Sequence, residues 1–145
     1  MYEIKQVVGE DILIRYNSLK VEIDRAMEHS DGEWNASQIV TKCITDPVNF
    51  HIWEVCIDGS PVAIASTRVM YYNSFTALHI TTLGGSGLYN HMTDLIEEFE
   101  AKVRGYKNID FLEYTGRKGF LKQLTKSGWR ETYTTMRKDI RGNNE

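Results

Sequence analysis

The sequence predicts an α/β fold with a mixed central sheet, and three observations lead to that class. Of the 145 residues, 41% are hydrophobic and 26% charged, which is the balance of an ordinary globular domain. The spacing of apolar residues changes along the chain from the helical period to that of strands and back. Three strands joined by short turns then lead into alternating helices and strands, so an antiparallel meander should continue as parallel strands.

The predicted element order is β-α-α-β-β-β-α-β-α-β, and its first three elements come from changes of period. Residues 2–7 alternate between polar and apolar types and predict a strand. Apolar residues recur at helical spacing over 12–27 and predict one amphipathic helix. Asn35 or Ser37 can cap a second, shorter helix. Pro47 ends this helix, because the residue before a proline avoids helical backbone angles.

The middle of the chain predicts three strands in a row. The residues over 50–57, 62–71 and 75–83 are rich in types that favour strands. Asp58-Gly59 separates the first two and suits a two-residue hairpin turn. Asn73-Ser74 turns the chain again. The three strands should therefore form an antiparallel meander.

The last third of the chain predicts a helix, a strand, a helix and a strand. Apolar spacing predicts a long amphipathic helix over 88–103. The short apolar run 109–114 predicts a strand buried on both faces. A further helix should stop at Gly128, a residue that suits the position after a helix. Residues 129–138, rich in threonine and aromatics, predict a final strand, and 141–145 a frayed tail.

Charge and composition disfavour several functional classes. The net charge of −3 gives no electrostatic reason for strong nucleic-acid binding. Positive charge gathers in the second half of the chain, but acidic residues are interleaved with it. Cys43 and Cys56 fit no metal-binding spacing and form no disulfide framework. No apolar run has the length of a membrane span. We therefore expect a single domain over 1–145 in the cytoplasm, with no metal site.

A glycine turn, Gly84-Gly85-Ser86-Gly87, lies where the third meander strand ends and the long helix begins. Glycine lets the backbone turn tightly and approach a ligand, so several N–H groups can point at one anion. The start of the helix adds unpaired N–H groups and the positive end of its dipole. The turn thus predicts a phosphate or pyrophosphate site. A plain connection between two elements is the alternative interpretation.

The element order, this turn and two later motifs resemble the acetyl-CoA-dependent N-acetyltransferase (GNAT) superfamily. The motifs are Thr115-Gly116-Arg117-Lys118-Gly119-Phe120 and Ser127-Gly128-Trp129. Within the superfamily the chain looks most similar to small GNAT-like proteins of bacteriophages. The resemblance covers essentially the whole chain, with its specific features between residues 61 and 140. It implies an acyl-CoA, such as acetyl-CoA, as co-substrate.

The resemblance also implies where that co-substrate would lie. Its pyrophosphate would bind the turn, and its pantetheine would occupy a cleft between the strands that end at Leu83 and Tyr114. The cofactor-binding residues would be Thr82, Leu83, Gly84, Gly85, Ser86, Gly87 and Leu88, with Arg117 and Lys118 at the start of the last helix.

Transfer of an acetyl group to an amine needs a base for one proton, an acid for the leaving thiolate and an N–H group near the thioester. His79 and Glu54, on facing strands, are the predicted bases, and Tyr114 could act as the acid. Each has a structural alternative. His79 would be a half-buried sheet histidine, Glu54 a carboxylate at a sheet edge, and Tyr114 a residue that bonds the backbone across the cleft.

Two functions follow from these features. The first is an N-acetyltransferase that acts on an unidentified amine of a small molecule, a protein or a modified base. The second is a catalytically inactive binding protein on the same scaffold, such as a phage virion component or an inhibitor of a host factor. Leu124, where the family often has a tyrosine acid, favours the second. The predicted partners are acyl-CoA with an amine acceptor, or a protein, with a homodimer as one assembly. A phage protein would work in the host cytoplasm or the virion.

Overall fold

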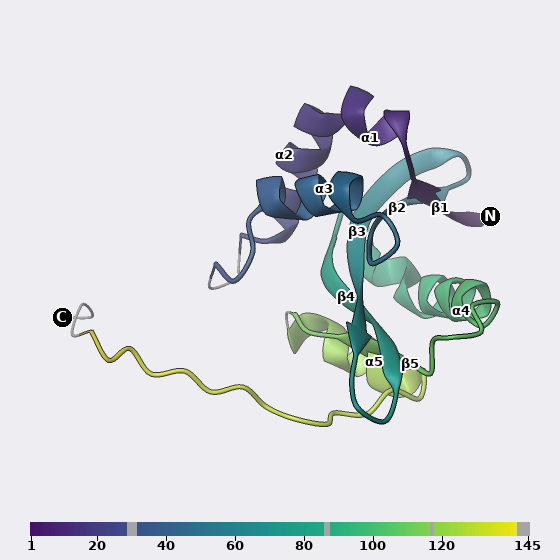
Figure 1. The fold of residues 1–145 in the computed structure, drawn as a ribbon. Helices are drawn as coiled ribbons and strands as arrows, with labels where there is room; N and C mark the ends of the chain where they lie inside the picture. Colours follow the sequence, from purple (N-terminus) through teal and green to yellow (C-terminus); the bar gives the residue numbers. More distant parts are fainter. Residues whose placement is uncertain (29–31, 86–87, 117, 142–145) are drawn as a thin grey trace.

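The computed structural model describes residues 1–28, 32–85, 88–116 and 118–141 (Figure 1). Its centre is a five-stranded sheet in the order β1-β2-β3-β4-β5. The first four strands pair antiparallel, and β5 pairs parallel with β4. The strands are β1 Tyr2–Val7, β2 Phe50–Ile57, β3 Ser60–Tyr71, β4 Thr76–Gly84 and β5 Phe111–Tyr114. The predicted mixed sheet, with a meander that leads into a parallel strand, is confirmed.

Helices pack on both faces of this sheet, and each face has its own core (Figure 1). The α1–α3 face is covered by α1 Glu10–Ile14, α2 Tyr16–Ala26 and α3 Ala36–Thr45. The α4 face is covered by α4 Met92–Val103 and α5 Leu121–Lys126, each preceded by a 3₁₀ turn, η1 Leu88–His91 and η2 Lys118–Phe120. The α1–α3 face buries apolar side chains such as Leu19, Ile23 and Ile52 completely. The sheet is therefore the middle layer of three.

The single helix predicted over 12–27 is wrong, because Arg15 divides it into α1 and α2. Arg15 is the C-cap of α1 and the N-cap of α2, with φ −97° and ψ 12°. Its guanidinium lies 2.6 Å from the Glu54 carboxylate on β2. The break lets the chain change direction while both helices keep apolar residues toward the sheet.

Of the two candidate caps for α3, the structure uses Asn35. Its side chain accepts a hydrogen bond from the Gln38 backbone N–H at 2.8 Å, and the Gln38 side chain accepts one from the Asn35 N–H at 3.0 Å. This reciprocal pair is a capping box. The helix ends at Thr45, before Pro47, as the sequence predicts.

The predicted last strand, residues 129–138, is wrong. These residues form no strand or helix, and Figure 1 shows the chain running away from the sheet. Trp129 still packs against the core of the α4 face. Beyond it, Tyr133 is 95% and Met136 89% exposed, so these side chains gain no apolar packing that would fix a conformation. Threonine and aromatic residues favour strands only where a neighbouring strand offers hydrogen bonds and a surface to pack on. Of the predicted frayed tail, 142–145 lie outside the described residues.

The prediction that β5 is buried on both faces is also wrong. Among the described residues β5 pairs only with β4, and so forms an edge of the sheet. Phe111 is 48% exposed and contacts the Phe75 ring at 4.8 Å between centroids. The apolar character of this strand reflects that cross-strand contact and the core of the α4 face, where Tyr114 packs.

Cys43, on α3, is 2% exposed, and burial raises the pKa of its thiol to about 12. In a Cys56→Ser variant we expect iodoacetamide at pH 8.5 to alkylate Cys43 more than about 100-fold more slowly than in urea, because the thiolate is the reacting form. A raised pKa stabilises the fold fully below the ordinary thiol value of 9.0, and this contribution is lost as the pH rises toward 12. Mass spectrometry follows the modification, and equal rates with and without urea would contradict the prediction.

Candidate functional site

Strands β4 and β5 separate about halfway along β4. They pair only over residues 77–80 of β4 and 111–114 of β5, with Ile80 opposite Tyr114 as the last pair. Strand β4 continues to Gly84 with β3 alone as its neighbour in the described residues. One edge of β4 is therefore open over residues 81–84, next to the start of the α4 region.

A β-bulge lies where this separation begins. Ser66 of β3 pairs with Thr82 and Thr67 pairs with Ile80, so Thr81 is an extra residue in β4. A bulge bends its strand and increases the local twist, and bulges are frequent beside active sites. Thr82 turns toward the α1–α3 face, where its hydroxyl lies 2.7 Å from that of Ser66. The bulge thus lies directly after Ile80, the last residue of β4 that pairs with β5.

The glycines at the end of β4 are required by packing within the chain. A Cβ at Gly84 would lie 2.8 Å from the Ala26 Cβ of α2. A Cβ at Gly85 would meet the Val62 carbonyl oxygen and, at 2.6 Å, the Ala63 Cα of β3. Ser86 and Gly87, also predicted to bind the co-substrate, lie outside the described residues. Gly84 and Gly85 thus let the end of β4 pack closely against α2 and β3.

His79 is held by a carboxylate from the neighbouring strand. It lies opposite Glu113 in the β4–β5 register, and its Nδ1 is 2.9 Å from the Glu113 Oε1. The side chains are 12% and 27% exposed. The Tyr72 hydroxyl donates to the same Oε1 at 2.9 Å. Partial burial, and then the hydrogen bond to Glu113, raise the pKa of Tyr72, which therefore remains a donor at neutral pH.

The sequence identified His79 but missed Glu113 and Tyr72 as its partners. Both the β4–β5 register and the turn after β3 are needed to bring these residues together, since Glu113 is 34 residues from His79 in the chain. The available signal was the alternation within each strand, which puts Glu113 on the same side of β5 as Phe111. Without the register, that alternation says nothing about His79.

Glu54 and Tyr114 lie apart from His79. Glu54 pairs with Arg15 at 2.6 Å. It is opposite Ile64 on β3, whereas His79 is opposite Arg68, a difference of roughly 13 Å along the sheet. Tyr114 lines the α4 face and packs its ring against Phe120, with 6.0 Å between centroids. The three predicted catalytic side chains therefore do not converge on one point.

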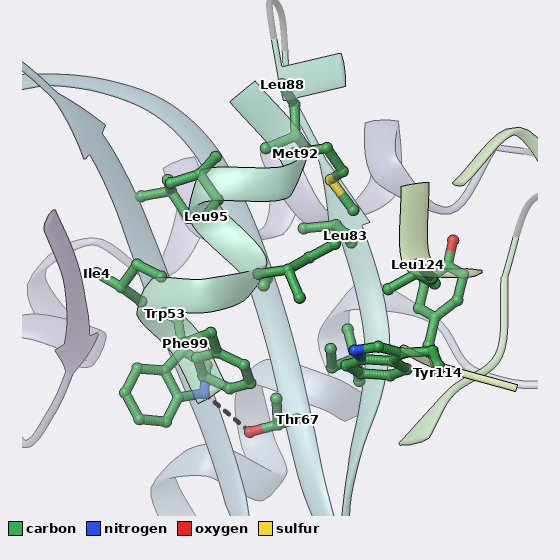
Figure 2. A pocket seen from close by; sticks show the side chains of 15 residues that line it. Ile4, Trp53, Thr67, Leu83, Leu88, Met92, Leu95, Phe99, Tyr114 and Leu124 are labelled. Carbon is green, nitrogen blue, oxygen red and sulfur yellow. Dashed lines mark hydrogen bonds between the residues drawn. The ribbon is translucent and has the colours of Figure 1, made fainter. Parts of the chain in front are cut away.

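A cavity of about 60 Å³ lies between the sheet and α4 (Figure 2). Figure 2 shows Leu83 from β4 and Met92 and Leu95 from α4 around it, with Leu124 and Tyr114 at one side. The indole N–H groups of the two tryptophans in the lining are both hydrogen-bonded. The Trp53 indole donates to Thr67 at 2.9 Å, and the Trp129 indole donates to Glu100 at 3.1 Å. Apart from Thr67 and Tyr114, which carry hydroxyls, and the two tryptophans, the lining side chains are apolar, and none of them is a carboxylate, an imidazole or a thiol.

The remaining predicted cofactor residues lie around this region. Leu83 and Leu88 line the apolar cavity, and Lys118 is exposed at the start of η2. Arg117 lies outside the described residues. The described part of the chain contains no cluster of three metal-binding side chains. It also contains no helix with the length and apolar character to cross a membrane.

No protein-family model matches the chain, and no curated protein matches it by sequence. Solved structures do match. A predicted acetyltransferase from Clostridium acetobutylicum, crystallised with acetyl-CoA, gives a TM-score of 0.68 at 12% identity over 100% of both chains. An aminoglycoside acetyltransferase from an uncultured soil metagenomic sample, in complex with sisomicin, gives 0.65 at 13% over 97% of both. A Trypanosoma brucei acetyltransferase gives 0.60 at 15% over 97% of this chain and 100% of that one.

These identities are too low to carry an activity from one protein to another, and the likeness concerns the arrangement of the elements. It extends over nearly the whole length of each chain. The mixed sheet with helices on both faces is the fold of the GNAT-type acetyltransferases, as the sequence predicts.

Proposed function

We propose that this chain is an N-acetyltransferase that moves the acetyl group of acetyl-CoA to an amine. One observation carries the proposal: the His79–Glu113 pair lies two residues before the bulge at which β4 leaves β5. A histidine held by a carboxylate thus lies close to the part of β4 that has no strand partner on the β5 side in the described residues. The fold shared with acetyltransferases supports the same function.

The open edge of β4 fits the co-substrate. Backbone groups of residues 81–84 have no strand partner on the β5 side in the described part of the chain. The amides of a pantetheine arm can pair with such an edge as an added strand does. The start of the α4 region and Lys118 would face the phosphates. When bound there, acetyl-CoA supplies an activated acetyl thioester.

His79 would take the proton of the attacking amine. Because the Glu113 carboxylate accepts hydrogen bonds, the proton between the two groups belongs to the Nδ1 of His79. The Nε2 then carries the lone pair and can act as the base. Tyr72 donates to the same carboxylate oxygen and helps to fix its position. Glu113 and Tyr72 are positioning residues in this scheme.

Calorimetric titration with acetyl-CoA tests the proposal. We expect saturable binding, and a Lys118→Glu variant that binds about five- to tenfold more weakly, because a negative charge replaces a positive one near the phosphates. Lys107→Glu is the matched control, since Lys107 is also exposed but follows α4 at its far end. An absence of binding at millimolar acetyl-CoA would contradict the proposal.

Release of free CoA in the presence of amines separates an enzyme from a binding protein on the same scaffold. We expect the protein to release CoA from acetyl-CoA faster than the same amine does in buffer without protein. Binding without turnover for a broad panel of amines would identify the chain as a binding protein. Its relation to bacteriophage proteins, its cytoplasmic location and a homodimeric state remain predictions from the sequence.

A further inference from the structure

A row of three polar side chains crosses the sheet on its α1–α3 face. Arg68 of β3 lies opposite His79 of β4, which lies opposite Glu113 of β5. Residues that are opposite in register point to the same face of a sheet. Arg68 and Thr81 also line a hollow beneath Trp34, in the segment that joins α2 to α3. The row therefore runs from the His79–Glu113 pair to this hollow.

Arg68 differs from the other members of the row because none of the acidic side chains in the described part of the chain pairs with it. The described residues include no ion pair to Arg68, and its Nε is buried without a hydrogen-bond acceptor. Its guanidinium carbon lies over the Trp34 ring, 5.3 Å from the centroid, in a cation–π contact. Glu113 is the acid of the row, but its Oε1 is taken by His79 and Tyr72. A buried N–H donor without an acceptor is costly, so an acceptor from outside the chain would be favourable here.

The chemistry of the guanidinium specifies that acceptor. Its planar set of N–H donors matches the two oxygens of a carboxylate, and the cation–π contact with Trp34 helps to hold the Arg68 side chain beside the hollow. The hollow has a volume of about 10 Å³, roughly the room of one water or one carboxylate oxygen. We infer that Arg68 binds a carboxylate of the acceptor, so that the acceptor is an amine with a carboxylate nearby, as in an amino acid.

This inference rests on the proposed function, in which the amine of the acceptor faces His79 and is acetylated. Arg68 and His79 are neighbours on adjacent strands, so one small molecule can reach both. A polycationic amine would meet the positive charge of Arg68 and should be a poor acceptor. Arg68 is thus assigned as a specificity residue, with no part in the proton transfer.

The first test needs no turnover. In protein labelled with ¹⁵N-arginine, acetate should shift the Nε–H resonance of Arg68 saturably, while acetamide, its neutral analogue, should not. The Arg68→Gln variant identifies the resonance by its loss, and the exposed Arg130 gives the baseline for surface effects. An unchanged Arg68 resonance, or an equal response to acetamide, would overturn the inference. If acetate binds but acetyl-CoA does not, the anion site stands and the acetyltransferase proposal fails.

The second test uses acceptors in pairs, each L-amino acid with its own amide. We expect Arg68→Gln to lower kcat/KM for the best amino acid at least tenfold through KM, with the amide and acetyl-CoA unaffected. Arg68→Lys keeps the positive charge but lacks the planar set of N–H donors. Its kcat/KM for the amino acid should lie between those of the wild type and Arg68→Gln. Circular dichroism checks that both variants fold. A wild-type preference for the amides, or for spermidine, would overturn the inference.

Discussion

Replacing Gly85 by alanine is expected to lower the free energy of unfolding by about 3 kcal/mol. The new methyl group would meet the Val62 carbonyl oxygen and lie 2.6 Å from the Ala63 Cα. Both are backbone atoms of β3, in the middle of the chain's own sheet, and neither can rotate away as a side chain can. The end of β4 would have to move from β3, which would also displace the edge proposed to bind acetyl-CoA.

Urea denaturation followed by far-ultraviolet circular dichroism measures this loss. Gly119→Ala is the matched control, because nothing lies within 4 Å of the position of its Cβ. That variant should stay within about 0.5 kcal/mol of the wild type. Equal stabilities of the two variants would show that Gly85 is not closely packed against β3. The reason for its glycine would then have to be sought in a ligand alone.

Replacing His79 by alanine is expected to reduce kcat by about 10²- to 10³-fold, the usual contribution of a general base. The affinity for acetyl-CoA should not change, because the side chain faces Glu113 on the α1–α3 side and not the backbone edge of β4. Glu113→Gln should have a smaller effect of about tenfold, since the imidazole remains but its Nδ1 proton is held less firmly. Steady-state assays of CoA release measure both.

Glu54→Gln separates this assignment from the other base that the sequence suggests. Glu54 is bound to Arg15 and lies away from His79, so its replacement should affect stability and leave kcat within about twofold. A large loss of kcat in Glu54→Gln together with an unimpaired His79→Ala would refute the proposed role of His79.

The periodicity of the sequence predicts strands and helices well where the structure depends on residues close together in the chain. The cap of α3, expected at Asn35 or Ser37 and found at Asn35, and the hairpin at Asp58-Gly59 are both local features that the sequence predicts. The break at Arg15 could not be read from the sequence, because the apolar spacing continues across it. The last strand fails for the opposite reason. Residues 129–138 have suitable types, but pairing depends on a neighbouring strand that the pattern cannot supply.

The candidate site shows the same limit. His79 could be found as a titratable residue in the strand before a glycine turn. Its relation to Glu113 and Arg68 depends on the registers of two strand pairs, and registers depend on the packing of the whole sheet. The bulge at Thr81 is equally hidden, because Thr81 and Thr82 are the same residue type and neither breaks the pattern.

Strand β5 is attached to the sheet by a short parallel pairing at an edge. The Glu113 side chain adds hydrogen bonds with His79 and Tyr72. Edge elements with few buried contacts open locally at a lower free energy than the whole protein unfolds. Each such opening would separate Glu113 from His79 while the other strands stayed folded. The proportion of molecules ready for catalysis would therefore follow the local stability of β5, and warming would remove activity before it melted the core.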